Sequence, residues 1–352
     1  MNGPNPCGTV APLVCISEPG LLAAQYDRRI PYVFQYEFNI QHQLSNSTVA
    51  EIGYFGSQSH FLQRFHNQNN PIPGTGPTAP RRPFPEVNAI QYVASNVNAN
   101  YHSLTGKITR RLTNGLSYMA GYTYSKAIDA GSGIRAFSQD NGIQNPACVR
   151  CERGLAVFDQ RQRLVTSVLY DLPAGKGYRL FNSGIGSYVL GGWQMSTIVS
   201  ISTGTPVGVG SGSNRSGVGL NNDRPNATGQ AVTLPSDQRG PNQWFDIGAF
   251  SLNPTATFGN VGRNVITGPG VFNWDYSLLK RFAFTESRYL QLRFEAFNAA
   301  NHPNWGDPGA SMALNQINAA TQRAIPGTGN FGVINSTRTG MRQIQIAMKI
   351  VF

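Results

Sequence analysis

The sequence predicts an all-β fold, namely an antiparallel up-and-down transmembrane β-barrel to which this chain contributes the C-terminal portion, about nine strands of a larger barrel. Three observations indicate this class. Charged residues make up 13% of the 352 residues, against about 25% in soluble proteins. No uninterrupted apolar run reaches the roughly 18 residues of a transmembrane helix, while apolar and polar residues alternate along many segments, as in membrane strands. The 39 Gly and 22 Pro predict many turns and little helix.

Alternation at a period of two residues places the strands one by one. In the first strand, Tyr32, Phe34, Tyr36 and Phe38 share one parity, and polar residues fill the other. In the eighth strand, the charged residues Arg293 and Glu295 both lie on the polar parity. In chain order, the nine predicted strands span residues 32–44, 48–56, 101–112, 116–125, 163–172, 192–204, 272–282, 288–298 and 341–352.

The connections between these strands alternate between short and long. Asn114-Gly115 between two alternating runs is the strongest local signal for a hairpin. Short periplasmic turns and long extracellular loops are typical of outer-membrane barrels. We therefore expect residues 1–30 to be an irregular segment or an extracellular loop, residues 31–352 to form the barrel, and the turn at 173–191 to be unusually long for the periplasmic side. The predicted extracellular loops span residues 57–100, 126–162, 205–271 and 299–340.

The placement of charges tests which parity faces lipid. Lys or Arg facing lipid costs about 2–4 kcal/mol at the bilayer midplane and about 0–1 near the interface. The parity opposite the aromatic residues, which we expect to face the lumen, carries Glu37, Glu51, Lys107, Arg111, Arg293, Glu295 and Lys349. Three residues break the rule, and all lie near a predicted short turn, where side chains can snorkel to water: His42, Arg110 and Lys280.

Other classes fit less well. A soluble β-sandwich also alternates, but loops of some 40 to 70 residues are unusual in such folds. The net charge of +11 is spread over the chain without a run of five basic residues, so we expect no nucleic-acid partner. Basic residues in a barrel lumen, or in loops near anionic lipopolysaccharide, would account for the charge. We expect lipid and lipopolysaccharide as the surroundings of the protein.

The sequence offers no pattern of a catalytic or cofactor site, and we expect neither an enzyme nor a bound cofactor or metal. Cys148 and Cys151 form a CxxC without a second pair of ligands, so they either make a local disulfide or have no special role. Cys7 and Cys15 are open to the same two interpretations. The glycine-rich run 208–219 lacks phosphate-loop spacing and predicts a mobile loop.

The last strand ends on alternating apolar residues, Ile344, Ile346, Met348, Ile350 and Phe352. A terminal Phe in phase with the lipid-facing parity resembles the insertion signal of bacterial outer-membrane proteins, which implies recognition by the barrel assembly machinery. In the strand before it, Arg293 and Glu295 lie on one lumen face and resemble a cross-strand polar ladder. A structural role for this pair and contact with a substrate or a plug both stay open.

Several stretches resemble the barrel of Oar-like TonB-dependent transporters, from about residue 30 to the end of the chain. The resemblance implies a barrel of roughly 22 strands, an N-terminal plug and coupling to a TonB-type energy transducer through that plug. No signal peptide precedes residue 30, so we expect this chain to be a fragment of a longer protein. The stretches are YHSLTGKITRRLTNGLSYMAGYTYSKAID (101–129), FDQRQRLVTSVLYDLP (158–173), GGWQMSTIVSISTGTP (191–206), RPNATG (224–229), FGNVGRNVITGPGVFNWDYSLLKRF (258–282), ESRYLQLRFEAFNAANHPNW (286–305) and FGVINSTRTGMRQIQIAMKIVF (331–352).

Three functions compete on this sequence. The first is a C-terminal fragment of an energy-coupled importer in the bacterial outer membrane, with an unidentified substrate. The second is an outer-membrane adhesin or scaffold whose long loops bind partners without transport. The third is a soluble secreted β protein, which recovery from the soluble periplasm or the medium would favour.

Overall fold

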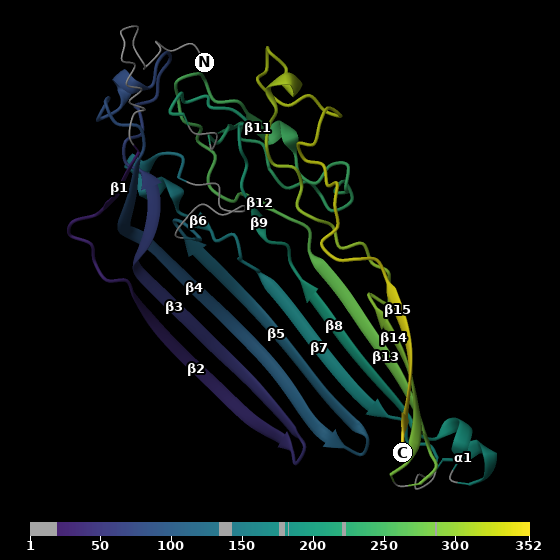
Figure 1. The fold of residues 1–352 in the computed structure, drawn as a ribbon. Helices are drawn as coiled ribbons and strands as arrows, with labels where there is room; N and C mark the ends of the chain where they lie inside the picture. The colour runs from purple at the N-terminus through teal and green to yellow at the C-terminus, as the bar shows by residue number, and fades with distance from the viewer. Residues whose placement is uncertain (1–19, 134–142, 176–179, 182, 220–222, 286) are drawn as a thin grey trace, which may run out of the picture.

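Nine long antiparallel strands form one continuous wall in the computed structural model (Figure 1). The structure describes residues 20–133, 143–175, 180–181, 183–219, 223–285 and 287–352. In chain order the wall strands are β2 (Tyr32–Ser45), β3 (Thr48–Asn67), β4 (Ile90–Thr113), β5 (Leu116–Asp129), β7 (Gln162–Asp171), β8 (Trp193–Ser202), β13 (Val271–Ala283), β14 (Tyr289–Phe297) and β15 (Gln343–Val351).

The wall strands follow one another in space in their order along the chain, which confirms the predicted up-and-down topology. Two short strands join at the side: β1 (Leu21–Ala24) pairs with β4, and β6 (Gly154–Leu155) pairs with β5. In the described part of the chain β2 and β15 form the two edges of the sheet and do not pair with each other, so the wall is an open sheet and not a closed barrel.

The pairing register brings the predicted parities into two continuous faces. Phe38 lies opposite Tyr54, which lies opposite Leu104 and then Tyr124. On the other face, Glu51 lies between Gln41 and Lys107. A slip of one residue would exchange these faces. The wall therefore has one aromatic and aliphatic face and one polar face.

The hairpin between β4 and β5 has the predicted turn chemistry. Asn114 and Gly115 both adopt positive φ, at 53° and 77°, as a two-residue turn of type I′ requires. A Cβ on Gly115 would also lie 2.8 Å from the carbonyl oxygen of Asp171. Glycine is needed at this position for both reasons.

Two predicted boundaries are wrong. Strand β3 ends at residue 67 instead of 56, and β4 begins at residue 90 instead of 101. The loop between them therefore covers 68–89 instead of 57–100. The pairing shifts between Ser59 and Leu62, and Phe61 has a φ of 56°. This bulge reverses the parity of the residues beyond it, which is why the alternation ends there although the strand continues. Residues 21–24, expected to be irregular, form β1 and pair in parallel with Ile90–Val93.

The long connections at one end of the wall fold into a packed assembly, which we call the cap (residues 143–161, 203–219, 223–270 and 298–342) (Figure 1). Two small sheets lie in it: β9 (Pro206–Val207) with β12 (Ile266–Thr267), and β10 (Asn226–Ala227) with β11 (Phe250–Ser251). Three 3-10 helices also lie in it, η2 (Pro146–Glu152), η3 (Ile247–Ala249) and η4 (Leu314–Gln316), and a fourth, η1 (Ala79–Arg81), lies in the 68–89 loop.

The opposite end of the wall carries the short turns and the one α-helix of the described residues, α1 (Gly184–Leu190). It lies in the long 173–191 turn and at the same end as the C-terminus (Figure 1). No helix in the described part of the chain is both long and apolar enough to cross a membrane.

Candidate functional site

The five residues of the predicted insertion signal lie on the apolar face of the edge strand β15 or directly after it. Ile346 lies opposite Phe294 and Met348 opposite Leu292, so they extend the apolar face of β14. Their side chains are exposed, Ile346 to 77% and Phe352 to 97%. Recognition of this segment by the assembly machinery stays a prediction.

Arg293 and Glu295 lie on the polar face of β14. Their charged groups approach to 3.8 Å between Nη1 and Oε1. The pair runs along one strand, because the residues opposite them on β15 are Ala347 and Gln345. The predicted cross-strand ladder is therefore a single ion pair along a strand, with Gln345 opposite Glu295 in the register. The Arg293 side chain is 45% exposed and that of Glu295 is 23% exposed, so both can be reached from the polar side of the wall.

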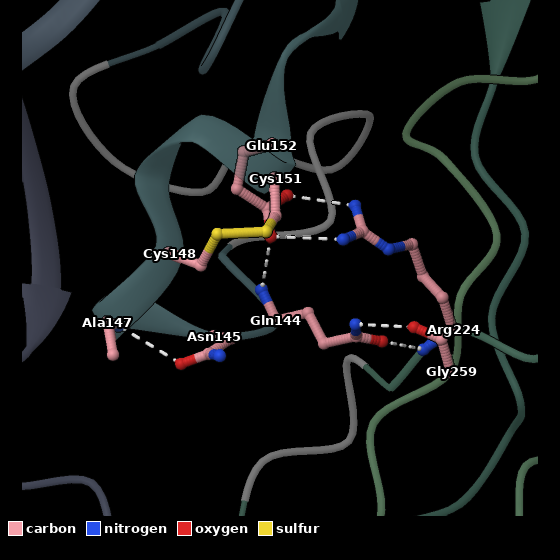
Figure 2. The surroundings of a disulfide bond; sticks show 8 residues. All are labelled: Gln144, Asn145, Ala147, Cys148, Cys151, Glu152, Arg224 and Gly259. Atoms are coloured by element: carbon pink, nitrogen blue, oxygen red, sulfur yellow. Dashed lines mark hydrogen bonds and ion pairs between the residues drawn. A yellow bond between two sulfur atoms is a disulfide. The ribbon is translucent and has the colours of Figure 1, made fainter.

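The most constrained polar group of the cap surrounds Glu152, directly after the CxxC. Cys148 and Cys151 are disulfide-bonded within η2, whereas Cys7 and Cys15 lie outside the described residues. Figure 2 shows the Glu152 carboxylate facing the guanidinium of Arg224. Two hydrogen bonds join them, at 2.8 and 3.1 Å, and the two side chains are 0% and 8% exposed.

Gln144 completes this group from both sides (Figure 2). Its backbone N–H donates to Glu152 Oε1 at 3.1 Å, and its side-chain amide donates to the carbonyl of Gly259 at 3.0 Å. Its amide oxygen accepts from the backbone N–H of Arg224 at 2.6 Å. Buried charges are tolerated only when they are paired and hydrogen-bonded. Three segments far apart in the sequence are joined here.

A second buried ion pair joins the cap to the rim of the wall. Arg263 pairs with Asp129 at the end of β5, and both side chains are about 3% exposed. The Nε of Arg263 also donates to the carbonyl of Glu152 at 2.9 Å. Burial, and then the charge of Arg64, lower the pKa of Arg263 to about 10. The guanidinium is thus still protonated at neutral pH and can pair with the carboxylate.

The glycine-rich run 208–219 is packed and not the mobile loop that its composition predicts. Ser211 and Ser216 are fully buried. The Asp223 carboxylate accepts from the Ser216 backbone N–H at 2.6 Å and from its hydroxyl at 2.8 Å. A Cβ on Gly212 would lie 1.5 Å from the carbonyl oxygen of Met312. Glycine permits this close approach of two backbones.

The centre of the cap is apolar. Phe245, Phe250 and Phe331 meet edge to face with ring centroids 5.1 to 6.0 Å apart, a favoured geometry of aromatic pairs. Because Phe331 comes from the last loop, this core fixes the 205–271 and 299–340 connections to each other. The other buried members are Val209, Ala249, Leu252, Val261, Ile266 and Met312.

A pocket of about 400 Å³ opens on the cap between residues 243–248 and residues 318–326. Its lining includes Asp246, Asn318 and Arg323, so it presents a carboxylate, an amide and a guanidinium together. Among the residues that the structure describes, no three His, Cys, Asp or Glu side chains are grouped so as to hold a metal ion. The pocket can form hydrogen bonds and ion pairs with a polar ligand.

Sequence spacing does not point to Glu152, Arg224, Asp129 and Arg263. Each stands alone in a stretch that is predicted to be a loop, and Asp129 is in fact the last residue of β5. The available signal is the scarcity of carboxylates, 17 Asp and Glu against 28 Lys and Arg, which makes each acidic residue in a long loop a candidate partner for a buried Arg.

Comparison with protein families gives one match that covers nearly the whole chain. The family model described as "Outer membrane beta barrel domain" matches residues 4–345. None of the curated proteins matches the chain.

Three solved structures resemble the fold at low identity. They are the outer membrane transporter YddB from Escherichia coli (TM-score 0.47, 9% identity, 95% of this chain), the FrpB iron transporter from Neisseria meningitidis (0.42, 10%, 94%) and FpvA from P. aeruginosa bound to pyoverdine (0.40, 10%, 91%). This chain covers 34%, 32% and 27% of their lengths.

Proposed function

Because this chain belongs to the outer membrane beta barrel domain family and is therefore a protein of the bacterial outer membrane, we propose that it is the C-terminal part of the barrel of a TonB-dependent transporter. The subfamily that we propose is the Oar-like one, on the strength of the sequence stretches that resemble it. The full-length protein would import a substrate with energy from a TonB-type transducer, which would act through an N-terminal plug.

The observation that carries the proposal is the two-faced wall. Its apolar face suits lipid, and its polar face suits a water-filled lumen that a plug can occupy. Glu51 lies opposite Lys107 on the polar face, and the Arg293–Glu295 pair is accessible there. These groups are available for contacts with a plug or a passing substrate.

The open edges support a larger barrel. Backbone N–H and C=O groups left unpaired in hydrocarbon cost several kcal/mol each, and in the described part of the chain β2 and β15 each lack a partner on one side. Further strands of a longer chain would pair with these edges and close the wall. A barrel of nine strands would also be too narrow for a plug domain.

The cap supplies the part of the proposed transporter that meets a substrate first. It lies at the end of the wall opposite to the C-terminus (Figure 1), which is the extracellular end if the last strand ends in the periplasm. Its pocket with Asp246 and Arg323 favours a polar or charged substrate.

The genomic sequence upstream of this chain tests the proposal first. An open reading frame that continues upstream through further strands and a plug domain is the expected result. An in-frame stop codon with no plug-like region before it would contradict the assignment as a transporter.

A second candidate is a surface adhesin or scaffold, which would use the cap to bind partners without transport. Deletion of the full-length gene separates the two. A transporter mutant would lose growth or uptake on at least one nutrient, whereas an adhesin mutant would take up every nutrient normally and lose attachment instead.

A further inference from the structure

We propose that helix α1 and the residues beside it form a membrane anchor on the outside of the wall, with their apolar side chains inserted among the acyl chains of the periplasmic leaflet. This goes beyond the proposed function, since it requires only that the apolar face of the wall meets lipid.

The side on which α1 lies follows from two cross-strand neighbours. Trp193 on β8 lies opposite Lys280 on β13. Both belong to the apolar face, because Met195 with Leu278 and Val199 with Trp274 are further pairs on the same face. Both side chains contact α1. The helix therefore lies against the lipid-facing side of the wall and not in the lumen.

Side-chain donors of the wall hold the C-terminal end of α1. The Nζ of Lys280 donates to the carbonyl of Tyr188 at 2.6 Å, to that of Val189 at 3.2 Å and to that of Gly191. The indole N–H of Trp193 donates to the carbonyl of Val189 at 2.9 Å. The last carbonyls of a helix lack partners within it, and a cation is favoured beside them.

This contact also explains a charge that the sequence places on the wrong parity. The sequence predicts that Lys280 reaches water at the interface, but its side chain is only 3% exposed. Its ammonium group lies 5.5 Å from the ring centre of Trp193 and 4.8 Å from that of Phe282. The carbonyls of α1 replace water as its partners, so a buried cation on this face requires the helix to stay in place.

The remaining surface of α1 is apolar and exposed. Residues 183–193 contain no Asp, Glu, Lys or Arg. Ile185 is 83% exposed, Tyr188 68% and Val189 55%, and Phe181 just before the helix is 55% exposed. An apolar surface of this kind marks a contact with protein or membrane.

Lipid is the occupant that the position favours. A plug would lie on the other side of the wall, and missing strands would pair at the edges β2 and β15, whereas α1 contacts β8 and β13 within the wall. A groove of about 360 Å³ between Val189 and the wall is lined by Trp193, Leu278, Phe282, Leu292 and Ile346. The apolar surface of α1 is thus continuous with the lipid-facing face. Interfacial helices bury their apolar side about 5–10 Å deep in a leaflet.

Spin-label accessibility tests the proposal on the full chain in outer-membrane vesicles. Labels are placed singly through Ile185→Cys, Phe294→Cys and Ser196→Cys, with Cys7 and Cys15 replaced by Ser and the Cys148–Cys151 disulfide kept. Phe294 lies on the apolar face and Ser196 on the polar face. Because Ile185 is exposed, its replacement leaves the fold intact.

We expect that oxygen reaches the label at position 185 and that a water-soluble nickel complex does not. The label at 294 should behave in the same way, whereas the nickel complex should reach the label at 196. Nickel access at 185 equal to that at 196 would overturn the anchor, and so would low access to both reagents, which indicates burial against protein. A label at 294 in water would instead contradict the membrane assignment itself, so the two failures are distinguishable.

Discussion

At the scale of single residues, the cap depends on charges that are buried in pairs. Arg224 and Glu152 bind through two hydrogen bonds with almost no exposure, while Arg338 and Asp307 form a pair that is 24% and 35% exposed. Removing one partner of a buried pair costs about 3–5 kcal/mol because an uncompensated charge stays behind. An exposed pair contributes about 0–1 kcal/mol. The two pairs thus offer a matched comparison.

We predict that Arg224→Met lowers the free energy of opening of the cap by about 3–5 kcal/mol, whereas Arg338→Met lowers it by about 1 kcal/mol or less. Amide hydrogen exchange of residues 143–152 and 223–263 measures this free energy. Equal effects of the two substitutions would show that the Glu152 site does not hold the cap together.

The Asp223 carboxyl predicts a pH dependence. Burial raises its pKa above the usual 3.8, against the hydrogen bonds from Ser216, which lower it. A folded-state pKa above the unfolded value means that the folded state binds more protons between the two values. Stability from this group therefore falls as pH rises through that window and is constant above it. Thermal unfolding of the cap at several pH values, followed by tryptophan fluorescence, should show this fall in the wild type relative to Asp223→Asn. Other carboxylates titrate alike in both proteins, and a parallel course of the two curves would contradict the assignment.

At the scale of elements, the length of each strand reflects two environments. About 9–11 tilted residues cross the hydrocarbon, and β7, β8, β14 and β15 have 9 or 10 residues. Strands β3 and β4 have 20 and 24, so they continue beyond the membrane toward the cap. The short 3-10 helix η2 and the helix α1 depend in turn on contacts with neighbouring elements.

The disulfide of η2 should contribute less to the stability of the cap than the Arg224–Glu152 ion pair beside it. It closes a loop of four residues, for which chain entropy gives about 2 kcal/mol. We predict that Cys148→Ser with Cys151→Ser leaves the cap folded and weakens it less than Arg224→Met does. Protease resistance of the cap on intact cells ranks the stability of the two variants. A double Cys variant that is more sensitive to protease than Arg224→Met would contradict the prediction.

The attachment of α1 should depend on Lys280. Hydrogen bonds to charged groups contribute about 1.5–3 kcal/mol each, and Lys280→Met removes the donor to three carbonyls. We predict faster amide hydrogen exchange in residues 184–191 of this variant. Lys349→Met on the polar face is the control and should leave that exchange unchanged, while unchanged exchange in both variants would mean that the lysine does not hold the helix.

At the scale of the whole molecule, one alternation decides which side of the wall meets lipid. Ile346 and Gln345 are neighbours in β15 and point to opposite faces. A substitution that is tolerated on one side should thus be harmful on the other.

We predict that Ile346→Arg lowers the stability of the inserted protein by about 2–4 kcal/mol if it lies near the bilayer midplane. Gln345→Arg should have little effect, because its side chain faces water. Heat-modifiable migration of outer-membrane fractions on electrophoresis gives the folded fraction of each variant. Similar losses for both would contradict a lipid-facing and a water-facing side.

Alternation in the sequence is sufficient to predict the wall. Every wall strand has one apolar and one polar side, and residues two positions apart share a side. The nine strands and their two faces can therefore be predicted without any knowledge of tertiary contacts. The prediction ended at the bulge near Phe61, where the parity changes.

The packing of the cap, the position of α1 and the partner of Lys280 could not be predicted from the sequence. Arg224 meets Glu152 across 72 residues and Lys280 meets Tyr188 across 92. Such contacts join residues that are far apart in the sequence and meet only in the folded chain, so local spacing does not predict them. Residues 208–219 show the same limit. Their composition indicates mobility, yet they are packed because Met312 from the last long loop approaches Gly212, while Asp223, seven residues beyond Ser216, binds its backbone and hydroxyl.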